Sequence, residues 1–567
     1  MTFLNRLKLC AAAALAVSIA APALSQGLAG SYLAARHASG FNDFRAAADY
    51  YTRAMVADPE NPALMEAAAR AHLSLGDLDR AVAIARRMDS IGAPTQIASI
   101  AILADRFQKG GFDGVLADLD AAPRIGPMVD SLLRAWAEIG AGRMSEALTA
   151  FDEVITTEGL EAFGLYHKAL ALALVGDLEG ADDILSGRSQ GTIALDRRGA
   201  LAHVQILSQL DRNADAIAVI DDRFGPQPDS GLIALRDRLD AGAPEPFDTI
   251  TSPTDGAAEV FYSVANALRN ESNSAYTLVF SRTAEILSPG HIDAILLSAA
   301  LLESMELYDL ATEAYGAIPR DDPAFSAAEI GRAESLRRAG DTEEGIAALR
   351  ALIADRPDIQ AAHVALGDAL RQEERYDEAS RAYDAAVDLI ETPSDRHWII
   401  FFARGITHER EDRWDNAEAD FRRALELRPN QPQVMNYLGY SFVEMGINLD
   451  EALDLIERAV AEDPGSGYIV DSLGWVLYRL GRFDEAVGHM ERAAELLPVD
   501  PIVNDHLGDV YWAVGRRIEA EFQWRRALSF DPEEEDAARI RRKLEIGLDA
   551  VLIEEGEEPV SADLRDG

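Results

Sequence analysis

Short polar and aromatic side chains recur at fixed distances from a repeated glycine in the C-terminal half of the sequence. Three residues before this glycine the chain carries Asn or Asp, and one or four residues after it Tyr or Trp is common. Short polar side chains can bond a peptide backbone, and aromatic and arginine side chains dominate many protein interfaces. The pattern therefore predicts a groove that binds a protein segment, although some of the aromatics could instead pack between neighbouring repeats. The predicted groove residues are Asn436, Tyr440, Asp471, Trp475, Tyr478, Arg479, Asp505, Asp509 and Trp512.

No arrangement of residues in the sequence is typical of an enzyme. Neither a Gly-x-x-x-x-Gly-Lys phosphate loop nor a His-Glu-x-x-His zinc motif occurs. The histidines are scattered, and His397 and His408, which lie near one expected helix, are not spaced as metal ligands. Adjacent acids such as Asp182 and Asp183 are expected by chance among 97 acidic residues. We therefore expect no enzymatic activity, no cofactor and no metal site.

The composition favours packed helices and argues against nucleic acid as a partner. Of the 567 residues, 48% are apolar but only 7% are aromatic, which suits closely packed helices better than a β-sandwich. The 97 acidic and 53 basic residues give a net charge of −44. Phosphate backbones and anionic membrane surfaces should be repelled by such a chain.

Residues 1–25 are typical of a secretory signal peptide. Arg6 and Lys8 form a basic start, an apolar run follows, and Ala23-Leu24-Ser25 supplies small residues for cleavage. The sequence therefore predicts a periplasmic protein, with peripheral association at the outer membrane left open. The single cysteine, Cys10, precedes the apolar run and is poorly placed for lipid attachment, so membrane association is not expected through Cys10. No later stretch is long and apolar enough for a transmembrane helix.

The predicted groove residues are positioned by a repeat. Counted from Gly474 or from Gly508, alanine stands at +12 and +19, a bulky residue at +16 and proline at +24. This spacing is typical of two antiparallel helices that each bury one apolar face, with proline ending the second. Followed along the chain, the pattern predicts an all-α solenoid of about fourteen helical hairpins.

A segment rich in proline and glycine divides the expected array. It prevents a continuous helix and is interpreted as a hinge or as a loop packed on the superhelix. The expected parts are a signal peptide (1–25), a degenerate N-terminal array (26–225), the inserted connection (226–256), a regular C-terminal array (257–532), a capping helix (533–550) and a disordered acidic tail (551–567).

The Leu-Gly-x-x-Tyr and Ala-x-x-x-Phe motifs followed by proline are the signature of the tetratricopeptide repeat. The C-terminal half also resembles a family of secreted bacterial tetratricopeptide proteins, on stretches such as Asp471-Ser-Leu-Gly-Trp-Val-Leu-Tyr and Asn504-Asp-His-Leu-Gly-Asp-Val-Tyr-Trp. It is similar to outer-membrane lipoproteins that act as adaptors for a periplasmic carboxyl-terminal processing protease. The resemblance implies a protein-binding scaffold that recruits such a protease and its cell-envelope substrates.

Two further considerations concern the partner. The lysines with which some tetratricopeptide domains bind acidic C-termini are missing from the predicted groove, so basic or neutral partner segments are expected. An alternative function is a scaffold that binds peptidoglycan or exported polysaccharide in envelope biogenesis, for which exposed aromatics would also serve.

Overall fold

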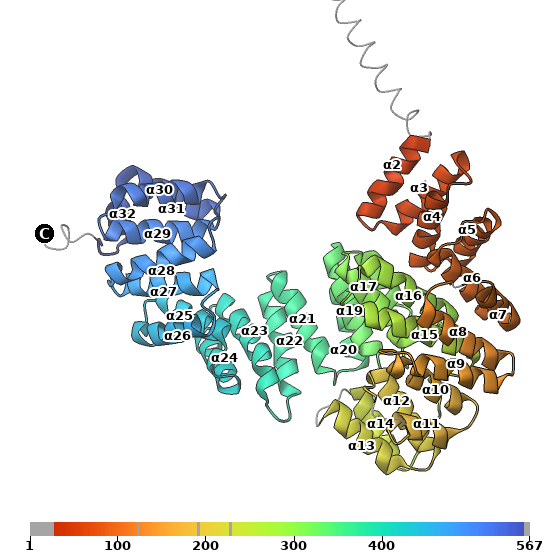
Figure 1. The fold of residues 1–567 in the computed structure, drawn as a ribbon. Coiled ribbons are helices and arrows are strands. Elements are labelled where there is room, and N and C mark those ends of the chain that lie inside the picture. The colour runs from red at the N-terminus through yellow and green to blue at the C-terminus, as the bar shows by residue number, and fades with distance from the viewer. Residues whose placement is uncertain (1–27, 123, 190–192, 226–229, 561–567) are drawn as a thin grey trace, which may run out of the picture. The chain divides into compact units, whose positions relative to one another are not determined.

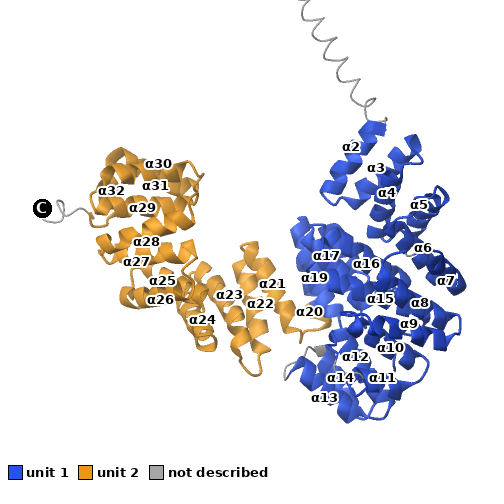
Figure 2. Cartoon of the chain, viewed as in Figure 1, with its two compact units in different colours: residues 1–352 blue, residues 353–567 orange. Residues whose placement is uncertain are grey.

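The computed structural model describes residues 28–122, 124–189, 193–225 and 230–560, and in these ranges the chain forms helices joined by turns and loops, without strands (Figure 1). The predicted signal peptide and the last residues of the predicted acidic tail, 561–567, lie outside the described residues. The chain divides into two compact units, residues 1–352 and residues 353–567 (Figure 2). None of the described helices has the length and apolar character needed to cross a membrane.

Unit 1 contains the helices that precede residue 353, apart from the last residues of α20. They are α2 (Leu28–Gly40), α3 (Phe44–Ala57), α4 (Pro62–Ser74), α5 (Leu78–Ser90), α6 (Gln96–Gln108), α7 (Phe112–Ala121), α8 (Pro127–Gly140), α9 (Met144–Ile155), α10 (Glu161–Leu174), α11 (Leu178–Leu185), α12 (Arg197–Gln209), α13 (Asn213–Phe224), α14 (Ser230–Asp240), α15 (Pro253–Leu268), α16 (Ser274–Leu287), α17 (Ile292–Ser304), α18 (Tyr308–Tyr315), α19 (Phe325–Ala339) and α20 (Thr342–Asp355).

Unit 2 continues the same arrangement of helices and ends in two more helices after the last proline of the repeat pattern. They are α21 (Gln360–Gln372), α22 (Tyr376–Asp388), the 3₁₀ helix η1 (Asp395–His397), α23 (Trp398–Arg410), α24 (Trp414–Leu427), α25 (Pro432–Glu444), α26 (Leu449–Glu462), α27 (Gly467–Arg479), α28 (Phe483–Leu496), α29 (Pro501–Ala513), α30 (Arg517–Leu528), α31 (Glu534–Ile546) and α32 (Leu548–Glu555).

The helices pair as hairpins, as the sequence predicts. Six pairs run from α2/α3 to α12/α13, α14 stands alone, and eight pairs run from α15/α16 to α29/α30. The described residues therefore contain fourteen hairpins, which agrees with the expected number and confirms the all-α solenoid.

The repeated glycine lies directly under a bulky side chain of the second helix. A Cβ atom added to Gly508 would lie 2.5 Å from the indole of Trp524, and one added to Gly405 would lie 2.6 Å from the ring of Phe421. Both rings are fully buried. Glycine is therefore required here because a ring occupies the space that a side chain would need, and this ring is the residue at +16 of the repeat.

A Gly508→Ala variant is expected to lower the free energy of unfolding of unit 2 by about 1–3 kcal/mol, because the buried indole of Trp524 would have to move. Gly488→Ala is the matched control, since its added Cβ meets nothing within 4 Å on an exposed face of α28. Removal of a mid-helix glycine there should raise stability by about 0.5–1 kcal/mol. Urea unfolding followed by circular dichroism measures both; equal effects of the two substitutions would contradict the packing argument.

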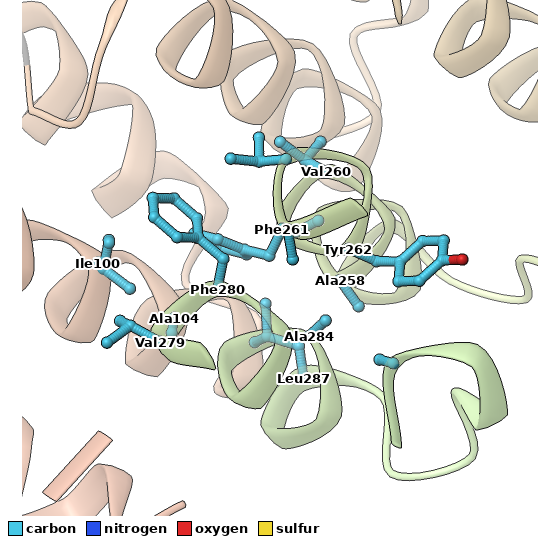
Figure 3. Packing of buried hydrophobic residues seen from close by; sticks show 14 of the residues in the cluster. Ile100, Ala104, Ala258, Val260, Phe261, Tyr262, Val279, Phe280, Ala284 and Leu287 are labelled. Atoms are coloured by element: carbon cyan, nitrogen blue, oxygen red, sulfur yellow. The ribbon is translucent and has the colours of Figure 1, made fainter. Parts of the chain in front are cut away.

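In unit 1 the first helices of the early hairpins are covered by later helices of the same unit. α15 packs against α6, α8 and α10, and α16 packs against α4 and α6. Figure 3 shows Phe261 of α15 and Phe280 of α16 close to Ile100 and Ala104 of α6. The apolar faces that a partner would need in this part of unit 1 are thus buried by the chain itself.

The segment between α13 and α15 is held by side chains of the preceding hairpin. Nδ2 of Asn213 donates to the carbonyl oxygens of Leu239 (3.0 Å) and Ala243 (3.2 Å). Gln205 bonds both Asp248 and Thr249 through its side-chain amide. The described part of the inserted connection, residues 230–256, therefore lies against α12 and α13.

Candidate functional site

An open cavity of about 610 Å³ lies across four successive first helices of unit 2. Its lining comes from the end of α23 and the turn into α24, from one face of α25, and from α27 and α29. We call this cavity the open groove. Its aromatic and apolar lining includes Trp414, Tyr437, Tyr440, Tyr468 and Ile502, and its polar lining includes Asn436, Asp471 and several other carboxylates.

Three of the nine predicted groove residues line the open groove. Asn436 and Tyr440 lie one helical turn apart on α25 and therefore share a face, and Asp471 occupies the position of Asn436 in the next hairpin. The side-chain oxygen of Asn436 is buried and has no hydrogen-bond partner. Burial, together with the hydrogen-bonded carboxylate of Glu444, raises the pKa of the Tyr440 hydroxyl, so this group stays protonated at neutral pH.

The next two predicted residues pack between hairpins. The rings of Trp475 and Tyr478 are stacked with centroids 4.7 Å apart, and Trp475 also stacks on His506 of α29 at 4.0 Å. Nε1 of Trp475 donates to Oε1 of Glu444 at 3.0 Å. Trp475 and Tyr478 are both buried, so they shape the wall between two hairpins, which is the alternative that the sequence left open.

Three predicted residues at the end of the array are covered by the C-terminal helices. Nζ of Lys543 on α31 donates to Oδ2 of Asp505 (2.8 Å) and to both carboxylate oxygens of Asp509 (2.7 Å each). Nε1 of Trp512 donates to Oδ2 of Asp549 on α32 at 2.8 Å. α31 and α32 therefore occupy the part of the predicted groove that belongs to the last hairpin, and the open groove is shorter than the sequence pattern implies.

The last predicted residue, Arg479, also meets the C-terminal segment. Its guanidinium lies 3.9 Å from the carboxylate of Glu557, and Val560 is buried against the core of unit 2. Within the predicted acidic tail, residues 551–555 belong to α32. The described part of this segment thus covers the repeats.

The carboxylate of Asp471 is paired with His506, whose Nδ1 lies 3.0 Å from Oδ2. Burial alone would lower the pKa of this imidazole, but the neighbouring Asp471, Asp505 and Asp509 carboxylates outweigh burial and raise it. A histidine whose pKa is raised by folding stabilises the folded state below its unfolded pKa and loses that contribution as the pH rises through the folded value.

A His506→Gln variant is therefore expected to show a stability deficit that shrinks as the pH rises from about 6 to about 8. Urea midpoints of the wild type and the variant, measured across this range, give the difference directly. The lost stacking on Trp475 adds a part that does not depend on pH, so only the slope is diagnostic. A deficit that is constant or grows with pH would contradict a charged His506–Asp471 pair.

Unit 1 contains a separate buried polar cluster around Glu259 of α15. Its Oε2 accepts from Nε of Arg198 (2.7 Å) and lies 3.1 Å from Nε2 of His291, and its Oε1 accepts from the hydroxyl of Tyr166 (2.8 Å). Burial would raise the pKa of Glu259, but Arg198 and His291 hold it well below its ordinary value. The carboxylate of Glu259 therefore joins α10, α12, α15 and α17. Because its partners hold it ionised, it is poorly suited to proton transfer.

Among residues 28–560, outside the short stretches that the structure does not describe, no group of three or more His, Cys, Asp or Glu side chains is placed to hold a metal ion. In the open groove, the hydroxyls of Tyr437 and Tyr440 are hydrogen-bonded to the carboxylates of Glu409 and Glu444. The groove offers charged side chains, hydrogen-bonding groups and aromatic rings to a bound partner.

A family model described as tetratricopeptide repeat matches residues 32–95, 330–395, 402–467, 448–501 and 472–535. These matches include both the first hairpins and the hairpins that form the open groove. The chain is a solenoid of tetratricopeptide repeats.

Known proteins resemble this tetratricopeptide solenoid over parts of its length. A TPR repeat-containing protein of Pseudomonas aeruginosa is 26% identical over 160 residues, which are 28% of this chain and 26% of that protein. The match thus spans about a quarter of the curated relative. A chain of the APC/C hetero-tetramer Cut9–Hcn1 is 14% identical over 93% of this chain and 98% of its own, with a TM-score of 0.38. YrrB, a TPR protein with an unusual peptide-binding site, is 19% identical over 34% of this chain and 92% of its own, with a TM-score of 0.27.

Sequence reasoning missed two exposed residues of the open groove. Tyr468 and Ile502 stand six residues before Gly474 and Gly508, in the first turns of α27 and α29, and are 60% and 50% exposed. Their shared repeat position is a signal that could have been used, because an apolar residue there is not needed for the hairpin core. Lys543 was also missed as a groove residue, although lysine is rare in this chain.

Proposed function

We propose that this tetratricopeptide protein is a non-catalytic adaptor of the bacterial periplasm that binds a segment of a partner protein in the open groove. The observation that carries the proposal is the groove itself: it crosses four hairpins, exposes Tyr468 and Ile502, and is lined beside them by carboxylates, hydroxyls and an amide. Exposed aromatic and aliphatic side chains beside polar groups are what an extended peptide needs for affinity and register.

The proposed partner is a periplasmic carboxyl-terminal processing protease, together with the cell-envelope substrates that it cleaves. The resemblance of the C-terminal repeats to adaptor lipoproteins supports this partner. The residues typical of a signal peptide support the location. If the location is right, the chain purified from its native host begins at Gln26; an intact mass that retains Met1 would contradict it.

Site-specific photo-crosslinking tests the groove. A benzophenone side chain introduced in place of Tyr468, which is 60% exposed in the groove, should capture a partner on irradiation in the native host. The same side chain in place of Phe522 is the matched control, because Phe522 is an aromatic of similar exposure (63%) on α30 that does not line the groove.

The expected result is a covalent adduct from position 468 and none from position 522, with a processing protease or an envelope protein identified in the adduct by mass spectrometry. Adducts of equal yield from both positions would contradict groove binding. Capture of glycan alone, or cosedimentation with purified peptidoglycan that depends on Tyr468, would favour the polysaccharide scaffold over the adaptor.

A further inference from the structure

The C-terminal cap shows which side chain the inner face of this solenoid can hold. The ammonium of Lys543 is fully buried between the carboxylates of Asp505 and Asp509, and it lies 5.8 Å from the centre of the Trp524 ring. Short ion pairs at 2.7–2.8 Å and an aromatic face beside the cation are the two contacts by which proteins bind ammonium groups. The chain therefore carries one example of a lysine seated in its own inner face.

The repeat positions of Asp505 and Asp509, which bind Lys543, recur one and two hairpins earlier, at the open groove. Asp471 and Asn436 correspond to Asp505, three residues before the repeated glycine. Trp475 and Tyr440 correspond to Asp509, and the carboxylate of Glu444 lies beside both of these side chains. Acceptor oxygens and aromatic rings thus stand together in the open groove as they do around Lys543.

The open groove carries a net negative charge. Its lining includes the carboxylates of Glu409, Asp412, Glu444, Asp471 and Asp500 but only one guanidinium, that of Arg410. Several of these carboxylates are hydrogen-bonded, but mostly by neutral groups, and neutral donors satisfy a carboxylate without cancelling its charge.

Two examples illustrate this point. The carboxylate of Glu444 accepts from Nε1 of Trp475 at 3.0 Å, and Asp500 accepts from the backbone N–H of Val503 at 3.0 Å. His506 beside Asp471 and Arg410 beside Glu409 compensate two of the five carboxylates. The negative field therefore persists in the groove and favours a cationic occupant over an acidic one.

We propose that the open groove selects an extended partner segment in which a lysine or arginine stands next to an apolar residue. This inference rests on the proposed function and specifies its partner. The cation is held by the groove carboxylates, as Lys543 is held by Asp505 and Asp509. The apolar side chain lies on Tyr468 and Ile502. Acidic segments, including those of a second copy of this chain, are repelled.

Fluorescence anisotropy with the full chain tests the inference. The probe is a fluorescein-labelled peptide of Lys-Leu-Ser-Gly repeats, compared with peptides of the same length that carry glutamine or glutamate in place of lysine. The groove variant combines Asp412→Asn, Glu444→Gln and Asp500→Asn, which keep an acceptor oxygen at every position. The control variant combines Asp450→Asn, Asp484→Asn and Glu495→Gln, which lie exposed outside the groove and change the net charge equally.

The lysine peptide is expected to bind, the glutamate peptide is not, and the groove variant should lose roughly tenfold in affinity for the lysine peptide while the control variant does not. An equal loss in the control variant would show attraction by net charge alone and overturn the inference.

A Tyr468→Ala, Ile502→Ala variant separates the two proposals. Suppose that this variant binds the lysine and glutamine peptides equally more weakly, while the groove variant that removes three carboxylates binds them normally. The groove then still binds peptides, and only the selection of a cation fails. If no peptide depends on any groove residue and position 468 captures no partner, both proposals fail.

Discussion

Replacement of Glu259 by glutamine is expected to lower the free energy of unfolding of unit 1 by about 3–5 kcal/mol. Glu259 is fully buried, and its carboxylate is the shared acceptor for Arg198, His291 and Tyr166. The amide of glutamine keeps the shape but removes the charge, and it turns one acceptor into a donor that faces the guanidinium. The buried guanidinium then loses its closest counter-charge, and that loss is what makes breaking a buried pair costly.

Urea unfolding of the wild type and of Glu259→Gln, followed by circular dichroism, measures this change. Glu313→Gln is the matched control, because Glu313 also pairs with an arginine, Arg45, but both side chains are more than half exposed. The control should change stability by less than about 1 kcal/mol. Equal small effects of the two substitutions would show that the cluster around Glu259 does not hold unit 1 together.

The pH dependence gives a second measurement on the same pair of proteins. Folding depresses the pKa of Glu259, so its contribution is fully present above the unfolded pKa, about 4.5, and is lost as the pH falls through the folded value. The gap in stability between wild type and Glu259→Gln should therefore be constant near neutral pH and narrow below about pH 4.5. A gap that widens in acid would assign the effect to something other than the charge of Glu259.

The hairpins could be predicted from the sequence because their determinants are local. The repeated glycine, the alanine at +12 and the proline at +24 lie within one unit, and each acts through helix packing or helix termination inside that unit. For the same reason, the residues three before and one after the repeated glycine could be placed on one face of the first helix. The side chains of Asn436, Tyr440 and Asp471 thus reach the open groove where the repeat pattern places them.

The helices and side chains that cover the first helices of the hairpins could not be predicted from the repeat. The packing of α15 and α16 against α4 to α10 joins segments far apart in the chain, and no periodic signal encodes such a contact. A single acid such as Glu259 resembles the many surface acids until the structure places it beside Arg198. Lys543 presents the same problem, because its helix has the amphipathic pattern of any capping helix while its decisive contact is with carboxylates of the preceding hairpin.

A Lys543→Met variant is expected to destabilise the docking of α31 and α32 on the last hairpin by about 3–5 kcal/mol. Methionine fills a similar volume, so the loss comes from charge: Asp509 is buried, and without the ammonium its carboxylate retains Arg539 as its nearest cation, at 3.7 Å. Hydrogen exchange of the α31 and α32 amides and the emission of Trp512 and Trp524 should both report a loosened cap. Arg541→Met, an exposed neighbour on the same helix, is the control and should leave both signals unchanged.

The double variant Lys543→Met, Asp509→Asn distinguishes charge from packing. Asparagine still accepts the bond that Nε1 of Trp524 donates at 2.8 Å but carries no charge, so it should restore much of the lost stability.

Burial raises the pKa of Asp509 even with Lys543 present, and removal of the ammonium removes an opposing influence. Because the folded state of the single variant then binds protons more readily than the unfolded state, its deficit should shrink as the pH falls, and the double variant should show no such trend. If the double variant is as unstable as the single one at every pH, the cap is held by shape, and Lys543 then no longer serves as an example of the ion pairing expected in the open groove.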